Sequence, residues 1–152
     1  MRIERLGTDK ISILTELFDY NDAEQMISEC TRDIRNGIID IFVLYDDNVL
    51  IGELHAMYEC DDINYAVRNR RAYIFAFRIR EGYQNKGYGT QFLRSVLSLL
   101  EEKGYREFTV GAEDDNLRAL HLYQTLGFNE FVLRKQEEYQ GDAYEYSLYL
   151  RR

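Results

Sequence analysis

One nine-residue segment constrains the fold of this chain more than any other. Residues 71–79 read Arg-Ala-Tyr-Ile-Phe-Ala-Phe-Arg-Ile, so apolar side chains occupy both of the alternating faces of a strand. A strand of this kind must lie inside a sheet that is covered on both sides. Helical periodicity flanks it at residues 23–36 and 87–103, which can supply that cover. The sequence therefore predicts a mixed α and β fold.

The other predicted elements fit one compact domain over residues 1–152. We expect further strands at residues 2–6, 38–45, 49–58, 107–112, 129–139 and 144–151. We expect helices at residues 8–18, 23–36, 87–103 and 116–126. Residues 46–48 and 140–142 are predicted turns between strands, and residues 60–69 are a predicted loop. The chain has no proline and no Gly/Ser-rich linker, so no domain boundary is expected.

Composition excludes several classes of partner. With 19 Lys and Arg against 27 Asp and Glu, the net charge is −8, whereas nucleic-acid-binding domains are usually basic. No apolar run approaches the roughly 18 residues of a membrane span. Residues 1–5 lack the apolar core of an export signal, so we expect a cytoplasmic protein. Cys30 and Cys60 have no metal or redox spacing and are expected as free thiols.

The charge is unevenly distributed. Residues 68–94 contain seven Lys and Arg but only one acid, Glu81, and so carry +6, which leaves −14 on the remaining residues. A basic segment in an acidic protein indicates one local anionic ligand rather than a long polyanion. The alternative is that Arg68, Arg70 and Arg71 belong to a solvated loop.

A glycine loop lies inside this basic segment, between the central strand and the next helix. Gly87 and Gly89 let backbone N–H groups approach a ligand, and the helix N-terminus adds partial positive charge, so the loop can cradle an anion. Tyr88 stands where a P-loop needs Lys, and Phe92 stands where a dinucleotide fingerprint needs glycine, which excludes both motifs. The alternative is a tight turn without a ligand.

A second segment begins at Asn116 and ends at Gly127-Phe128. Ala119 and Tyr123 are four residues apart and share one helix face, and the small residue lets another surface come close. Gly127 is expected to end the helix. A half-buried core position is the alternative for Tyr123.

Together, the two segments resemble the GNAT superfamily of acyl-CoA-dependent N-acyltransferases. Gln84-x-x-Gly87-x-Gly89 is similar to that family's pyrophosphate motif, and the segment from Asn116 to Phe128 to its second motif. The order and spacing fit the chain, although the first fifty residues match only by element order. The resemblance implies a seven-stranded mixed, twisted sheet with about four helices. Its two parallel middle strands splay apart to form the acyl-CoA cleft.

The resemblance also implies site residues. Acyl-CoA, most simply acetyl-CoA, is the expected cosubstrate, and no metal is expected because no cluster has ligand spacing. The implied cofactor-binding residues are Phe77, Arg78, Ile79, Gln84, Asn85, Lys86, Gly87, Tyr88, Gly89, Thr90, Asn116 and Tyr123. Tyr123 is the expected general acid, and the amide near Ile79 the expected oxyanion donor.

The resemblance does not by itself identify the general base. Some members of the family carry Glu where this chain has Tyr73, and others where it has Gly111. Glu113 lies near the second of these positions and is the expected base, with Glu53 and Glu81 as further candidates. A solvated surface carboxylate is the alternative at each of the three, and a water chain to bulk solvent is another route.

The expected acceptor is a primary amine on a small molecule or peptide. The excess of acidic residues favours a cationic acceptor, and Tyr139, Tyr144 and Tyr146 are candidates to line its pocket, unless they are packing residues. His55 and His121 are isolated and receive no role. The resemblance also suggests a homodimer. Two other functions stay open, a non-catalytic acyl-CoA-binding module and an unrelated nucleotide-binding domain.

Overall fold

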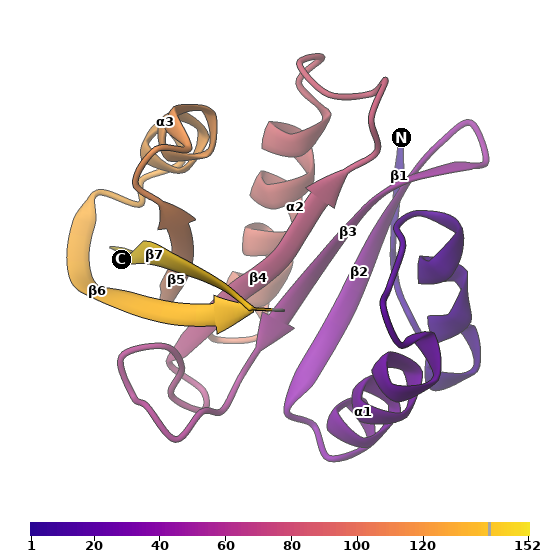
Figure 1. Cartoon of the computed structure of the whole chain (residues 1–152), viewed down its shortest axis with the longest axis horizontal. Coiled ribbons are helices and arrows are strands. Elements are labelled where there is room, and N and C mark those ends of the chain that lie inside the picture. The colour runs from indigo at the N-terminus through magenta and orange to yellow at the C-terminus, as the bar shows by residue number, and fades with distance from the viewer. Residues whose placement is uncertain (140) are drawn as a thin grey trace.

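The computed structural model describes residues 1–139 and 141–152, with no side-chain description for Tyr139. In this part of the chain, one sheet of seven strands has the order β1-β2-β3-β4-β5-β7-β6 (Figure 1). The strands are β1 (Arg2–Arg5), β2 (Ile39–Asp46), β3 (Val49–Met57), β4 (Arg71–Ile79), β5 (Glu107–Glu113), β6 (Glu130–Tyr139) and β7 (Asp142–Arg151). The helical segments are η1 (Thr8–Glu16), α1 (Ala23–Arg35), α2 (Tyr88–Glu102) and α3 (Leu117–Thr125). The predicted fold class is thus confirmed; Gln140, in a predicted turn, lies outside the described residues.

The first helical segment differs from an ordinary α-helix. Residues 8–16 form a 3-10 helix, in which residues three apart lie above one another. Ile11, Leu14 and Leu17 have this spacing, and all three are buried in the core. The three-residue apolar period explains why the tighter helix fits here.

The next helix begins at a side-chain cap. The Asp22 carboxylate accepts a hydrogen bond of 3.0 Å from the backbone N–H of Gln25, and it satisfies one of the otherwise unpaired donors of α1. The helix ends before Gly37, whose φ of +69° needs a glycine-like conformation.

The predicted hairpin between β2 and β3 is confirmed. Asp47 and Asn48 have φ angles of +47° and +70°, which is the pattern of a two-residue type I′ turn. Asp and Asn tolerate this left-handed region better than most residues.

Helices cover the sheet on both faces (Figure 1). On one face, η1 and α1 pack against β1–β3, and their core includes Ile11, Leu14, Ile41 and Val43. On the other face, α2 carries five buried residues into a second core: Phe92, Leu93, Val96, Leu97 and Leu100. This double cover accounts for the apolar residues on both sides of the central strand.

The two middle strands pair over only part of their length. β4 and β5 are parallel, and their register runs from Arg71 opposite Glu107 to Ile74 opposite Val110. Beyond that point β4 pairs only with β3, and β5 only with β7. The strands therefore separate and leave one backbone edge of residues 75–79 unpaired by β5, as the predicted splay requires.

A bulge bends β4 at the same level. Ala76 has a φ of +48°, and the register between β3 and β4 shifts between Glu53 and His55. Such a bulge inserts an extra residue and turns the strand locally. It re-aims the end of β4 just where the opening between the strands begins.

Two smaller expectations can be compared with the structure. Cys30 and Cys60 are both free. None of the helices in the described residues is long and apolar enough to cross a membrane.

We expect Phe92→Ala to destabilise the protein by about 3–5 kcal/mol, because the ring is fully buried where α2 meets the sheet. Leu99→Ala on the same helix is the matched control, since Leu99 is 41% exposed and should cost about 1 kcal/mol or less. Urea unfolding measures both. Equal losses would contradict the assignment of this helix face to the core.

Candidate active site

Two cavities meet where β4 and β5 separate. The loop cavity, of about 590 Å³, is lined by the end of β4, the glycine loop and α3. The tyrosine cavity, of about 640 Å³, is lined by the loop after β3 and by residues of β4, β5, β6 and β7. Asn116, Ala119 and Tyr123 line both cavities. One face of α3 and its cap therefore stand where the two cavities join.

The glycine loop presents backbone amides to the loop cavity. Gly87, the N-cap of α2, has a φ of +87° and provides no side-chain cap, so the first N–H groups of α2 stay open to a ligand. Asn85 also adopts a left-handed φ of +63°. The Gln84 side chain donates a 2.9 Å hydrogen bond to the carbonyl of Ile79 and thereby ties the loop to β4.

Most of the predicted cofactor residues lie at this cavity. Phe77, Arg78, Ile79, Gln84, Asn85, Gly87, Gly89, Thr90, Asn116 and Tyr123 line it. Lys86 and Tyr88 do not. The Tyr88 hydroxyl donates instead to Asp46 at 2.8 Å, which turns this ring toward the β2–β3 hairpin. The Arg118 side chain donates to the Asn85 side chain and links α3 to the loop across the cavity.

Tyr123 is buried at the junction of the cavities, and only 9% of its surface is exposed. Its ring packs near Phe77 and Phe128, with centroid distances of 6.5 and 5.9 Å. Burial raises its pKa to about 12, so the phenol stays protonated at any physiological pH. Asn116 accepts a 3.2 Å hydrogen bond from the N–H of Ala119 and caps α3, as its position in the sequence predicts.

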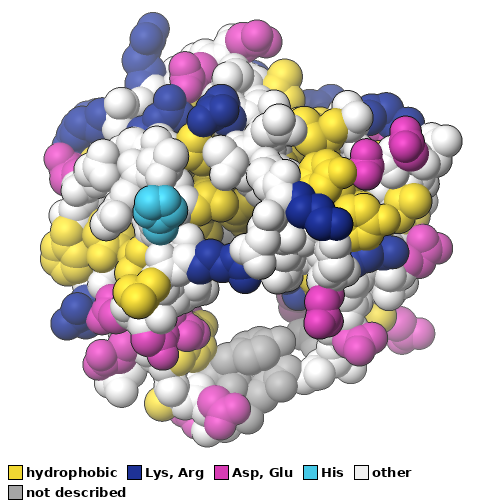
Figure 2. All heavy atoms as spheres, turned by 90° about the horizontal axis from the view of Figure 1, so that it is seen from above, with side chains coloured by type: hydrophobic (Ala, Val, Ile, Leu, Met, Phe, Trp, Pro, Cys, Tyr) yellow, Lys and Arg dark blue, Asp and Glu magenta, His cyan; other side chains and the backbone are white. Residues whose placement is uncertain are grey.

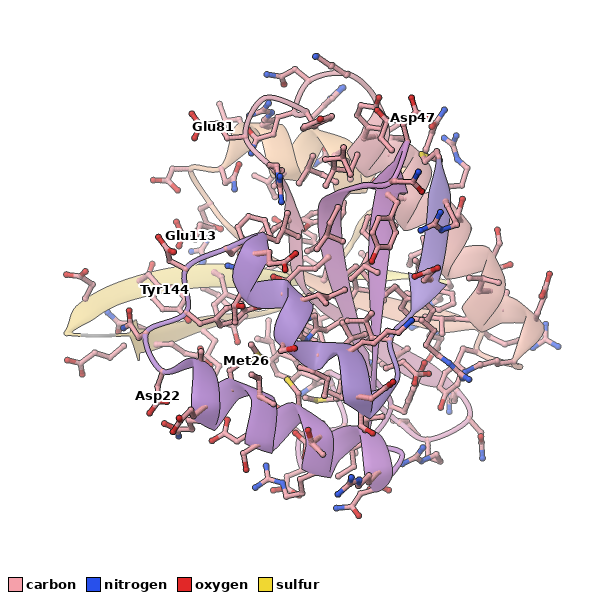
Figure 3. The ribbon with its side chains drawn as sticks, turned by 90° about the vertical axis from the view of Figure 1, so that its right-hand side faces the viewer. Asp22, Met26, Asp47, Glu81, Glu113 and Tyr144 are labelled. Carbon is pink, nitrogen blue, oxygen red and sulfur yellow. The ribbon has the colours of Figure 1, made fainter. Side chains whose placement is uncertain are left out.

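The tyrosine cavity has aromatic and acidic walls. Its lining includes Tyr65, Tyr73, Tyr144 and Tyr146, together with the carboxylates of Asp62, Glu113 and Glu137 and the ammonium of Lys135. In Figure 3, Glu113, Tyr144 and the start of α1 at Asp22 all lie on the same side of the molecule. Figure 2 views the molecule from the top of Figure 1 and shows a hollow in the surface. In this view, Lys and Arg side chains lie at the upper rim of the hollow, and Asp and Glu side chains lie to its left and right.

Tyrosines fill the places where the resemblance allowed a catalytic glutamate. A Cβ on Gly111 would lie 3.0 Å from the Tyr146 ring and 3.7 Å from the Tyr73 hydroxyl. A larger side chain at position 111 would therefore have to displace Tyr146. Among the candidate carboxylates, Glu113 lines the tyrosine cavity, whereas Glu81 is exposed on the glycine loop and lines neither cavity (Figure 3).

Glu53, the third candidate, lines neither cavity and belongs to a buried cluster. Its fully buried carboxylate accepts hydrogen bonds from the Tyr20 hydroxyl at 2.8 and 2.9 Å and from Arg78 at 2.5 Å, and it lies 2.8 Å from His55 Nε2. The Arg78 guanidinium also stacks over the Phe18 ring at 4.1 Å. These contacts hold the segment between η1 and α1 against β4.

Two opposing effects set the pKa of Glu53. Burial raises it, but the hydrogen bond and charge of His55, the charge of Arg78 and the Tyr20 hydroxyl together hold it below its ordinary value. Glu53 is therefore charged at neutral pH, and its role in this geometry is to fix the neighbouring segment.

Three arginines of the basic segment form ion pairs with carboxylates of the protein itself. Arg70 and Arg71 pair with Glu107 at 3.2 and 3.1 Å, and Arg78 pairs with Glu53. These arginines therefore neutralise carboxylates from other parts of the sheet. The open N–H groups at the start of α2 are a second feature of this segment that suits an anion.

Several lining residues carried no signal in the sequence. Phe18, Arg118 and His121 line the loop cavity, and Tyr65 and Glu137 line the tyrosine cavity. Phe18, Tyr65 and Glu137 come from segments distant from the motifs, whereas Arg118 and His121 lie within the second segment at positions to which its pattern gave no role. Tyr139, which was expected near the acceptor, has no described side chain. Within residues 1–139 and 141–152, no group of three or more His, Cys, Asp and Glu side chains is placed to hold a metal ion.

Comparison with known proteins gives the same family at the level of sequence. The profile of the acetyltransferase (GNAT) family matches residues 10–128. N-alpha-acetyltransferase 30 of Schizosaccharomyces pombe is 28% identical over 109 residues, which are 71% of this chain and 70% of that protein.

Solved structures share the fold. The ribosomal-protein-alanine N-acetyltransferase of Brucella melitensis superposes with a TM-score of 0.78 at 13% identity and covers 99% of both chains. A putative acetyltransferase of Salmonella typhimurium, solved with its cofactor acetyl-CoA, superposes with a TM-score of 0.74 at 16% identity, over 99% of this chain and 92% of that one.

We expect Glu53→Gln to lower the free energy of unfolding by about 2 kcal/mol at pH 7, less than the roughly 3–5 kcal/mol of a fully buried pair because Arg78 is partly exposed. The folded pKa of Glu53 lies below its ordinary 4.5, so its contribution is present above that pH and is lost as the pH falls through the folded value. The difference between wild type and variant should therefore shrink below about pH 4.5.

Denaturant unfolding between pH 3 and 8 measures this difference. Glu59→Gln is the control, because Glu59 forms only an exposed pair with Arg68 at 3.8 Å and should change stability by less than about 1 kcal/mol. A Glu53→Gln deficit that persists unchanged at pH 3 would contradict the assigned charge state.

Proposed function

The chain belongs to the GNAT family of acetyltransferases, and from this premise we propose that it transfers an acetyl group from acetyl-CoA to the primary amine of a cationic acceptor. The observation that carries the proposal is the junction of two cavities at Tyr123, one suited to the cofactor and the other to the amine. Both substrates would bind together, and the amine would attack the thioester directly.

The loop cavity supports the choice of cofactor. The open amides at the start of α2 suit the pyrophosphate of CoA, because unpaired N–H groups and the helix dipole both favour an anion. The backbone edge of β4 beyond Ile74, which β5 leaves unpaired, suits the amides of pantetheine. The structural relative from Salmonella typhimurium carries acetyl-CoA on the same fold.

The proposed reaction uses the groups where the cavities join. The amine nitrogen bonds to the thioester carbon, and an amide near Ile79 stabilises the oxyanion. The C–S bond then breaks, Tyr123 protonates the departing thiolate, and the proton that the attached nitrogen loses restores the Tyr123 hydroxyl. Because the pKa of Tyr123 is about 12, well above the roughly 8.5 of an ordinary thiol, its proton must move together with C–S cleavage. One proton from the acceptor ammonium reaches solvent in each turnover.

The tyrosine cavity supports a cationic amine as the acceptor. Three carboxylates against one ammonium leave its wall negative, and tyrosine faces attract cations. The names of two relatives describe amines at protein N-termini or on a ribosomal protein's alanine. Glu113, at the end of β5, lines this cavity and is the base predicted from the sequence.

We further propose that the protein works in the cytoplasm, where its two free thiols would stay reduced. We also propose a homodimer. The outer strand β6 has an open edge and carries Phe131, which is 57% exposed and offers a surface for such a contact.

One observation favours a second function. Gly111 and Tyr73 leave the two family positions for a glutamate base without a carboxylate. A module that binds acyl-CoA without catalysis would have the same cofactor cavity, and amine-dependent turnover distinguishes the two functions.

We expect acetyl-CoA and CoA, but not ATP or NAD, to raise the melting temperature. At a hundred times the dissociation constant, a ligand adds about 2.7 kcal/mol, which is roughly 5–10 °C for a domain of this size. Gly87→Ala should weaken this shift because a side chain at φ +87° strains the loop amides. Gly104→Ala, with φ +104° at the other end of α2, is the matched control and should keep the shift. A uniform response to all four ligands would argue against a CoA site.

We expect Tyr123→Phe to lower kcat by about 100-fold or more, since the variant keeps the ring but loses the proton donor. The shift with CoA should stay close to that of wild type. Thiol release with a panel of amines measures turnover, mass spectrometry identifies the product, and Tyr149→Phe serves as the control. Unchanged turnover in Tyr123→Phe would rule out the acid role.

A further inference from the structure

A chain of hydroxyl groups leads from the tyrosine cavity to a carboxylate. The hydroxyl oxygens of Tyr65 and Tyr146 lie 2.5 Å apart, and the Tyr146 hydroxyl donates to Glu137 Oε1 at 3.2 Å. Tyr65 and Tyr146 are buried, at 5% and 8% exposure, whereas the Glu137 side chain is 37% exposed. All three line the same cavity. The chain thus connects a buried part of the cavity wall to a partly exposed carboxylate.

The donors in this chain can point in only one direction. A tyrosine hydroxyl has a single hydrogen, and that of Tyr146 is directed at Glu137. Tyr65 must therefore donate to Tyr146 in the short bond between them. The Tyr65 oxygen is left with acceptor capacity only, which suits an N–H of an ammonium or of a bridging water.

Glu137 is held in its charged form. Burial raises its pKa, but hydrogen bonds from Tyr144, Lys135 and Tyr146 lower it, and the balance lies below the ordinary value. The distances are 3.0 Å from Tyr144 and 3.3 Å from Lys135. A carboxylate that is deprotonated at neutral pH can accept a proton, and the partial exposure of Glu137 lets it pass that proton to solvent.

Gly111 connects this chain to the missing glutamate. A Cβ at position 111 would lie 3.0 Å from the Tyr146 ring, so a glutamate there would require this tyrosine of the chain to shift. The hydroxyl chain in its present geometry therefore goes with a glycine at this level of β5.

Resting on the proposed function, we propose that the acceptor ammonium loses its proton through Tyr65 and Tyr146 to Glu137. The N–H bond breaks as Tyr65 gains that proton and gives its own to Tyr146, which gives its own to Glu137. Both tyrosines end neutral with their hydrogen bonds reversed, and the amine ends neutral with a free lone pair. Glu137 then releases the proton to water. Glu137 is a positioning residue that acts through the tyrosines.

The test is the pH dependence of Glu137→Gln and Tyr146→Phe at saturating acetyl-CoA. The probes are two simple primary amines, strongly basic n-propylamine and weakly basic 2,2,2-trifluoroethylamine. At pH 7 with n-propylamine, we expect kcat/KM to fall by about 100-fold in each variant. The loss should shrink as the pH approaches the pKa of the amine, and it should be small with trifluoroethylamine, because those acceptors are already deprotonated.

Matched variants separate this role from a structural one. Glu138→Gln, at the exposed neighbouring residue of β6, should behave as wild type. Tyr65→Phe combined with Tyr146→Phe should lose no more than either alone, since residues in series do not add. Thermal unfolding with and without CoA should show that Glu137→Gln folds and binds the cofactor normally.

Several results would overturn the proposal. A Glu137→Gln loss that is equal at every pH and for both amines would show a purely structural role. The same pH-sensitive loss in Glu113→Gln, with Glu137→Gln unaffected, would assign the proton to Glu113. If the wild type shows amine-dependent turnover and Glu137→Gln has the same turnover, the relay is overturned but the proposed function is not. A wild type without amine-dependent turnover would overturn the proposed function and the relay with it.

Discussion

The site depends on the point at which β4 and β5 stop pairing. Four residues of each strand are in register, up to Ile74 and Val110, and the strands then diverge. Backbone groups that lose a ladder partner must find another one or face a ligand. The divergence therefore creates both the opening and the unpaired edge on which the cofactor proposal rests, while the bulge at Ala76 turns the end of β4 beside it.

The separation is stable because each strand keeps its other neighbour. β3 stays paired with β4 as far as Ile79, and β7 stays paired with β5 as far as Glu113. The buried Glu53–Arg78 pair adds a charged bond across the β3–β4 ladder just at this level. α3 then seats Tyr123 between Phe77 and Phe128, which closes the base of the opening with aromatic surface.

The two cavities differ in how they recognise charge. The loop cavity offers backbone amides and a helix N-terminus. Three arginines of the neighbouring sheet form ion pairs with Glu53 and Glu107. The tyrosine cavity offers carboxylates and phenol oxygens. Under the proposed function, an anionic cofactor and a cationic amine would be attracted to opposite sides of Tyr123 before the reaction.

The sequence by itself determined the order of the elements, apart from the 3-10 form of η1, and the local geometry of the glycine loop and of the α3 cap. The two-faced strand at Arg71–Ile79, the left-handed glycine at Gly87 and the Asn116 cap each depend on local chemistry, which short segments carry in full. Only the tertiary structure brings Tyr65 together with Tyr146 and Glu137, because Tyr65 lies 81 residues from Tyr146 in the sequence. Their alignment requires the β6–β7 hairpin, which carries Tyr146 and Glu137, to fold back over the end of β5. Tertiary structure also decided the ion-pair partners of the arginines, because a pair forms with whichever carboxylate the fold brings near. Neither composition nor spacing in the sequence identifies that carboxylate.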